Sequence, residues 1–395
     1  MHLTGTRARD PHEAHRAATP LELLFDLTFV VAVAAVVPQF AHAIVDDHAL
    51  EGLIGYAAIF FAIWWAWMNF TWFASAFDCD DAFYRVLTLV QMAGVLVLAA
   101  GVGPAFEESD YRTAVLGYVI MRGALVIQWL RVAIQVPAYR TNALRFAIGI
   151  TAVQTLWVVR LLLAEEASVS AFLLFAALEL LIPVWADRVN TTPWHPHHIA
   201  ERYGLFTIIV LGESVLATAT AFIVSKDEVG VSLDLVVVAG SGLVLLFALW
   251  WLYFLQASGP ELERHRSLAF LWGYGHFFVF ASLAAVGAGI EVVTEAITHE
   301  IPAGPLLVAY SLALPVAIYL LFLWFLHSRM GSHGRYPRWL IVGELVLFLG
   351  IPLLALVVSQ AVVAALLAGA AAGLIAVKSW LKLRAGPVEE LVSVG

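Results

Sequence analysis

The sequence predicts an all-α fold, a polytopic transmembrane helical bundle of about twelve spans built as two parallel six-helix repeats. Of its 395 residues, 62% are hydrophobic and only 13% are charged, and the mean hydropathy is +0.88. A soluble domain carries about 25% charged residues. Uncharged apolar stretches recur along almost the whole chain. Lipid is therefore expected to solvate most of the outer surface.

The length of these stretches favours helices. About 20 apolar residues cross the ~30 Å of hydrocarbon in a bilayer. A β-barrel would need strands of about ten residues with alternating polarity, whereas the run from Leu205 to Ala221 does not alternate. The twelve expected spans are 20–44, 49–73, 83–103, 111–136, 143–163, 168–186, 200–225, 231–256, 266–290, 304–327, 338–358 and 361–380.

The segments outside these spans are polar. Residues 1–19 lack the apolar core of a signal peptide and are expected to form a cytoplasmic tail. Residues 187–199 form a polar linker between two halves, 20–186 and 200–380, and residues 381–395 form a second cytoplasmic tail.

A repeated pentapeptide supports the division into halves. The sequence Phe-Ala-Ile-Trp-Trp at 61–65 recurs as Phe-Ala-Leu-Trp-Trp at 247–251, near the ends of the second and eighth spans. Because each half has an even number of spans, both enter the membrane in the same direction. This predicts a pseudo-two-fold axis along the membrane normal, as in transporters with parallel repeats.

The distribution of charge predicts the orientation. Cytoplasmic loops carry an excess of Lys and Arg, and placing both termini in the cytoplasm puts most of the 21 basic residues on that side. The expected location is the cell membrane, with the lipid bilayer and an unknown small solute or ion as partners. No basic stripe points to a nucleic acid.

Ionisable residues inside the spans are the candidate site. A charge at mid-bilayer costs about 2.5–3.5 kcal/mol, so it usually faces a cavity or the bundle interior. Glu213 lies near the midplane, Glu179 and Arg122 are at comparable depth, and His276 is not far off. These side chains are expected to bind a substrate or ion, with Arg122 paired to Glu179 or Glu213. The alternative is that the pairs only lock helices together.

A second group lies toward the cytoplasmic side. Glu22 and Asp26 are four residues apart and share one helix face, an arrangement suited to a proton or cation relay. Glu22, His198, Glu201 and Arg202 are expected to form a gate or ion pair. Asp26 is assigned to the substrate or ion site. A purely structural role at the interface is the alternative.

Signatures of enzymes are absent from the sequence. It contains no P-loop, no GxSxG and no HExxH motif, so no catalytic residue, cofactor or metal is predicted. The histidines at 195, 197 and 198 are interrupted by Pro196 and are interpreted as part of a polar loop. The single cysteine, Cys79, excludes an internal disulfide.

Two motifs carry a resemblance to a known family. The run Pro-Leu-Glu-Leu-Leu-Phe-Asp-Leu-Thr-Phe-Val at 20–30 and the run His-Ile-Ala-Glu-Arg-Tyr-Gly-Leu-Phe at 198–206, continued by Leu-Gly-Glu-Ser at 211–214, resemble those of the low temperature requirement protein A (LtrA) family. The resemblance implies a multi-pass membrane protein linked to growth in the cold. It implies no settled substrate or reaction.

The leading hypothesis for function is a secondary transporter or ion-coupled permease. Asp26 and Glu213 would line a central polar cavity, and the cytoplasmic gate would open as one half rocks against the other. The alternative is a membrane-embedded enzyme or factor that acts on lipids or lipid-linked substrates in cold adaptation. A sensor or scaffold is disfavoured, because the sequence offers no soluble domain.

Overall fold

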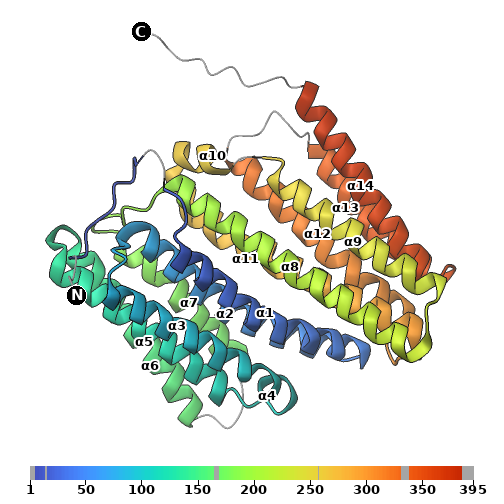
Figure 1. The fold of residues 1–395 in the computed structure, drawn as a ribbon, viewed down its shortest axis with the longest axis horizontal. Coiled ribbons are helices and arrows are strands. Elements are labelled where there is room, and N and C mark those ends of the chain that lie inside the picture. Colours follow the sequence, from blue (N-terminus) through green and yellow to red (C-terminus); the bar gives the residue numbers. More distant parts are fainter. Residues whose placement is uncertain (1–4, 14–15, 164–168, 257, 331–337, 385–395) are drawn as a thin grey trace. The chain divides into compact units, whose positions relative to one another are not determined.

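The computed structural model describes residues 5–13, 16–163, 169–256, 258–330 and 338–384 (Figure 1). These residues form helices and connecting segments, with no strand among them. Twelve of their helical segments are long and apolar enough to cross a membrane. The predicted all-α fold and the predicted number of spans are therefore confirmed for the described part of the chain.

The helices begin and end close to the predicted spans. In chain order they are α1 Pro20–Val45, α2 Ala49–Phe77, α3 Ala82–Ala100, α4 Val102–Glu107, α5 Arg112–Gln135, α6 Arg140–Leu163, α7 Val169–Ala186, α8 Pro196–Val229, α9 Leu233–Phe254, α10 Ser258–Arg264, α11 Ala269–Thr298, α12 Pro305–Arg329, α13 Arg338–Gly350 and α14 Gln360–Arg384. Short 3-10 turns at Pro137–Tyr139, Arg266–Leu268 and Ile351–Leu356 adjoin α6, α11 and α13.

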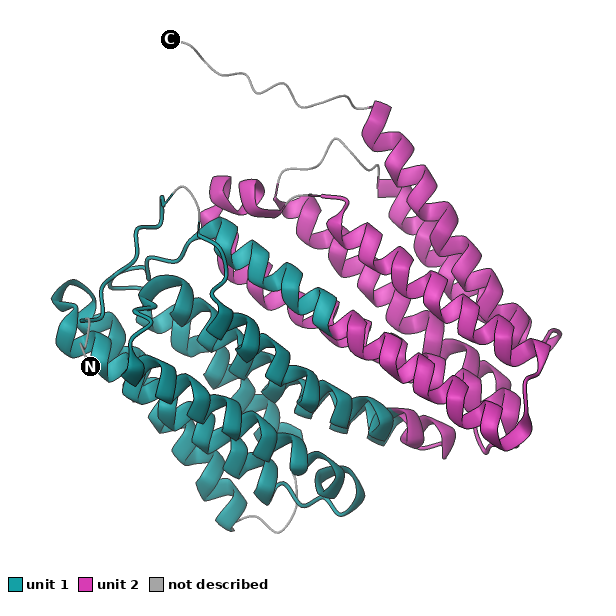
Figure 2. Ribbon diagram, viewed as in Figure 1, with its two compact units in different colours: residues 1–40, 50–209 teal, residues 41–49, 210–395 magenta. Residues whose placement is uncertain are grey.

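The chain divides into two compact units (Figure 2). Unit 1 comprises residues 1–40 and 50–209, and unit 2 comprises residues 41–49 and 210–395. The boundaries of these units fall inside α1, at the start of α2 and inside α8. The duplication of two six-helix halves stays a prediction. The two Trp-Trp pairs that suggest it differ in environment, since Trp64 and Trp65 are buried whereas Trp250 and Trp251 are exposed.

Glycines permit close helix contacts inside each unit. In unit 1, a Cβ at Gly117 of α5 would lie 2.3 Å from the backbone nitrogen of Leu98 in α3. In unit 2, a Cβ at Gly289 of α11 would lie 2.5 Å from the carbonyl oxygen of Ser311 in α12. Small residues at such crossings let backbones approach in a membrane, where apolar burial alone does not drive helix association.

Helix α8 begins four residues earlier than the predicted span. Pro196 is its first residue, a position where the missing N–H costs nothing. The ring nitrogen Nδ1 of His195 accepts a hydrogen bond from the backbone nitrogen of His198 at 3.3 Å and so caps this first turn. His198 is therefore part of a helix and not of a loop, and its side chain is fully buried.

Candidate functional site

The centre of the candidate site is the guanidinium of Arg202 in α8, which contacts two carboxylates of α1. Its Nε and Nη2 donate to Asp26 Oδ2 at 2.8 Å and Oδ1 at 2.5 Å. Its Nη1 lies 3.1 Å from Glu22 Oε1. All three side chains are fully buried. Two-point contact between a guanidinium and a carboxylate is strong and fixes geometry.

The start of α1 holds Glu22 in place. The backbone nitrogen of Thr19 donates to Glu22 Oε2 at 2.7 Å, and the backbone nitrogen of Glu22 donates to Thr19 Oγ1 at 3.3 Å. This reciprocal pair is a capping box, with Pro20 at the first helical position. The sequence Thr-Pro-Leu-Glu at 19–22 carries this signal, which hydrophobic length alone does not reveal. The box leaves Oε1 of Glu22 to face the basic groups.

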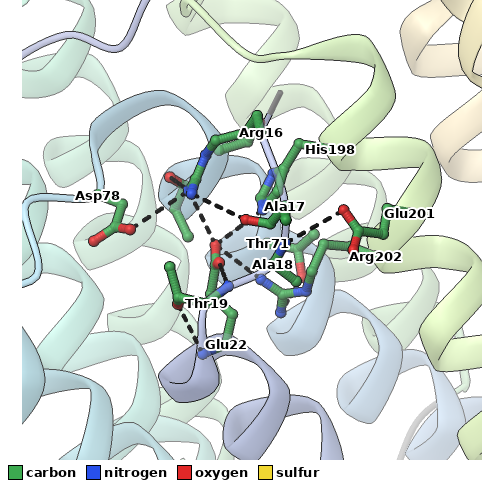
Figure 3. A network of polar contacts seen from close by, with 12 residues as sticks. Arg16, Ala17, Ala18, Thr19, Glu22, Thr71, Asp78, His198, Glu201 and Arg202 are labelled. Carbon is green, nitrogen blue, oxygen red and sulfur yellow. Dashed lines mark hydrogen bonds and ion pairs between the residues drawn. The ribbon is translucent and has the colours of Figure 1, made fainter. Parts of the chain in front are cut away.

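His198 and Arg16 also contact Glu22, and Arg16 links it to Asp78 (Figure 3). His198 Nε2 lies 3.2 Å from Glu22 Oε1. Arg16, which precedes α1, reaches Glu22 Oε1 at 3.4 Å and Asp78 Oδ2 at 3.5 Å. Asp78 directly follows α2 and is buried. The network of Arg16, Glu22, Asp26, Asp78, His198 and Arg202, here called the Arg202 network, contains three carboxylates, two guanidiniums and one imidazole.

Helix α2 supplies neutral donors and acceptors to this network. Trp67 Nε1 donates to Asp26 Oδ1 at 2.7 Å, and Thr71 Oγ1 accepts from Arg202 Nη2 at 3.3 Å. Trp67 and Thr71 are four residues apart and therefore lie on one helix face. A buried charge pair is tolerable only when such hydrogen bonds satisfy its remaining polar atoms.

The segment before α1 is packed against the helices. The backbone nitrogen of Thr6 donates to Gln135 Oε1 at 2.7 Å, that of Arg9 to the Ala76 carbonyl at 2.9 Å, and Glu13 O lies 2.8 Å from His195 Nε2. The described part of the predicted tail is thus held at the ends of α2, α5 and α8. This packing is what buries Arg16, of which 7% is exposed.

Burial and charge act together on Asp78. Loss of solvent raises the pKa of this carboxyl, the nearby charge of Glu22 raises it further, and Arg16 opposes both. The pKa of Asp81, the residue that caps the N-terminus of α3, shifts in the opposite direction. A hydrogen bond from Arg131 lowers its pKa. The polar end of unit 1 therefore holds carboxyls of different proton affinity.

A second charge pair of unit 1 joins α5 and α7. Arg122 Nη2 donates to Glu179 Oε2 at 2.5 Å, and Trp65 Nε1 of α2 donates to the same oxygen at 2.9 Å. All three side chains are buried. Of the two partners considered for Arg122 from its depth, the structure shows Glu179. Asp26 and Glu179 are thus neutralised by different arginines.

Two of the expected site residues belong to unit 2. Glu213 lies about midway along α8, and none of the described side chains forms a hydrogen bond or ion pair with its carboxylate. His276 of α11 is buried, with Nδ1 2.7 Å from the Trp272 carbonyl and Nε2 3.2 Å from the hydroxyl of Tyr253. A further buried pair, Lys378 with Glu344 at 3.0 Å, joins α14 to α13.

The expected gate residues are only partly brought together. Glu22, His198 and Arg202 meet in the Arg202 network. Glu201 is exposed, and its carboxylate accepts from the backbone nitrogen of Ala18 at 3.3 Å. Sequence reasoning missed Arg16, Asp78 and Trp67. Arg16 and Asp78 lie outside the apolar stretches, where a search for charges within spans does not look.

Comparison with known proteins identifies the same family as the two sequence motifs. The family model described as bacterial low temperature requirement A protein (LtrA) matches residues 17–377. An uncharacterised protein of Rhizobium meliloti (strain 1021) is 24% identical over 292 residues, which cover 68% of this chain and 67% of that protein. The matched region includes the Arg202 network apart from Arg16, and all twelve candidate spans begin within it.

Proposed function

Because the chain belongs to the bacterial LtrA family and has twelve candidate spans, we propose that it is a secondary transporter in which protons drive the movement of a small solute. The proposal includes a position in the cell membrane with both termini in the cytoplasm, which the distribution of Lys and Arg supports. The Arg202 network is the proton site, at the cytoplasmic end of unit 1.

The observation that carries this proposal is the imbalance of charge in the Arg202 network. With carboxyls ionised and His198 neutral, three carboxylates face two guanidiniums, so one negative charge is unbalanced in a buried site. The charged and titratable groups around Glu22 and His198 are Arg16, Asp78 and His195 outside the spans, Asp26 of α1, Tyr84 of α3 and Arg202 of α8. Binding of one proton makes the net charge of the Arg202 network zero.

His198 is placed to carry that proton. Nε2 lies 3.2 Å from Glu22 Oε1, and neither ring nitrogen has a hydrogen-bond partner of good geometry. Protonation converts the contact with Glu22 into an ion pair, and loss of the proton weakens it. Since His198 is on α8 and Glu22 on α1, this change alters how firmly the two helices are held, which is the property a coupled gate requires.

Glu213 is a second carboxylate that supports ion coupling. It lies at mid-helix depth, where a lone charge is costly, and no described side chain compensates it. Its binding of a cation or proton is part of the proposal. The assignment of Asp26 and Glu213 to one cavity stays a prediction. The carboxylate of Asp26 accepts two hydrogen bonds from Arg202.

The test is solute-driven proton movement in proteoliposomes. Purified protein is reconstituted with the pH indicator pyranine inside, and amino acids, organic acids and amines are added outside in turn. At least one class is expected to change the internal pH, with no change in protein-free liposomes. If none of these solutes moves protons while lipid analysis shows a modified lipid, the enzyme alternative replaces the proposal.

A further inference from the structure

A second set of buried polar groups lies at mid-membrane depth in unit 1. Arg122 is near the middle of the 24-residue α5, Gln154 near the middle of the 24-residue α6, and Glu179 near the middle of the 18-residue α7. Consecutive spans run antiparallel, and α6 packs against both α5 and α7. The three side chains are therefore at one level. With Trp157, one turn beyond Gln154, they are called the midspan cluster.

Several polar atoms of this cluster lack a partner. The ion pair uses Nη2 of Arg122 and Oε2 of Glu179. Nε and Nη1 of Arg122, Oε1 of Glu179, both amide atoms of Gln154 and Nε1 of Trp157 are buried without a hydrogen bond. The exposed fraction is 1% for Arg122, 0% for Glu179 and 8% for Gln154.

Such a concentration of unsatisfied buried atoms favours binding of an external polar partner. A buried polar atom that has lost water and gained nothing costs free energy. Lipid chains cannot form the missing hydrogen bonds. The same level of the bundle thus presents free donors from Arg122, Gln154 and Trp157 and free acceptors from Glu179 and Gln154. A molecule that is not part of the chain can satisfy both kinds.

We propose that the midspan cluster binds a small zwitterionic solute of the α-amino acid type. Its carboxylate would accept from Arg122 and Trp157, and its ammonium group would donate to Oε1 of Glu179 and the amide oxygen of Gln154. The Arg122–Glu179 pair is neutral, so a solute without net charge leaves the membrane interior neutral. Phe172, whose ring centroid is 5.5 Å from that of Trp157, adds an aromatic wall.

This inference rests on the proposed function, since it names the solute that the protons would drive. It places solute and proton on different residues of unit 1. The midspan cluster holds the solute, and the Arg202 network holds the proton. Binding of solute can therefore be measured without any transport.

The experiment is equilibrium binding of radiolabelled glycine to the purified full-length protein. Unlabelled glycine is expected to compete, whereas acetate and methylamine, which each carry one half of the zwitterion, compete at least tenfold more weakly. Arg122→Gln and Glu179→Gln are each expected to weaken binding at least tenfold. Trp157→Phe keeps an aromatic ring and removes the indole N–H, so it tests the hydrogen bond without removing the aromatic side chain. Trp250→Phe, at an exposed position of unit 2, is the matched control.

The outcomes separate the two proposals. Saturable glycine binding that Trp157→Phe weakens and Trp250→Phe does not supports the site. No glycine binding to folded wild-type protein overturns it, as does equal binding by all variants. If another class of solute moves protons while glycine does not bind, the site is wrong and the transporter proposal stands. If glycine binds but no solute moves protons, the site stands and the transporter proposal fails.

Discussion

Arg202 and Asp26 are joined by two hydrogen bonds, at 2.5 and 2.8 Å, although 176 residues separate them in the sequence. The pair ties the first turns of α8 to the start of α1 inside unit 1. Each residue belongs to one of the two motifs shared with the LtrA family. Glu22 and Asp26 of the first motif thus meet His198 and Arg202 of the second in one buried site.

Arg202→Gln is expected to destabilise the protein strongly. Removing one partner of a buried ion pair leaves an uncompensated charge and costs about 3–5 kcal/mol. Adding Asp26→Asn is expected to recover part of the loss, because it removes that charge. Thermal unfolding in detergent measures both effects. Arg85→Gln, in an exposed pair with Asp80, is the control and should leave Tm nearly unchanged. Equal shifts in Arg202→Gln and Arg85→Gln would contradict the assignment.

Asp187 is expected to make stability depend on pH. Burial raises the pKa of this carboxyl from 3.8 to about 6, although Asn142 donates a hydrogen bond to it. The folded state then binds the proton more tightly than the unfolded state, so stability is highest below the unfolded pKa and falls as pH rises through about 6. Asp187→Asn should remove this fall. Parallel Tm curves for the two proteins between pH 4 and pH 7 would show that Asp187 has no such role.

Gly117 is expected to tolerate no side chain. A Cβ there would meet the backbone of α3 at 2.3 Å, so Gly117→Ala must force α3 and α5 apart, at a cost of about 1–3 kcal/mol. Gly123 lies on the same helix with nothing within 4 Å of its Cβ position. Gly123→Ala should be neutral or slightly stabilising. Comparison of their Tm values checks the packing, and a reversed order would refute it.

The single cysteine offers a test of orientation. Cys79 lies between α2 and α3, at a loop expected to face the cytoplasm, and burial raises the pKa of its thiol. A membrane-impermeant maleimide should label it slowly in inverted vesicles and not in intact cells. In a Cys79→Ser background, Ser109→Cys in the loop before α5 should show the opposite pattern. Labelling of Cys79 in intact cells would contradict the proposed topology and indicate the opposite orientation.

The sequence predicts the architecture better than the composition of the site. Hydrophobic length alone identifies the spans, because a bilayer requires about 20 apolar residues from each helix. Similar depth in the membrane predicts an ion pair of Arg122 with either Glu179 or Glu213, and the structure shows the pair with Glu179. Arg16 and Asp78 could not be found in this way, since their burial comes from the packing of the N-terminal segment against the ends of α2, α5 and α8. The role of Trp67 was hidden because aromatic residues are common throughout the spans.

The central claim is that the Arg202 network binds the proton that drives transport, and the most direct measurement compares two histidine variants. Proton flux into pyranine-loaded proteoliposomes is recorded for His198→Gln and for His197→Gln, whose exposed side chain lies outside the network. The account predicts that His198→Gln loses solute-driven proton flux while His197→Gln keeps the wild-type rate. Unchanged proton flux in folded His198→Gln protein would contradict it.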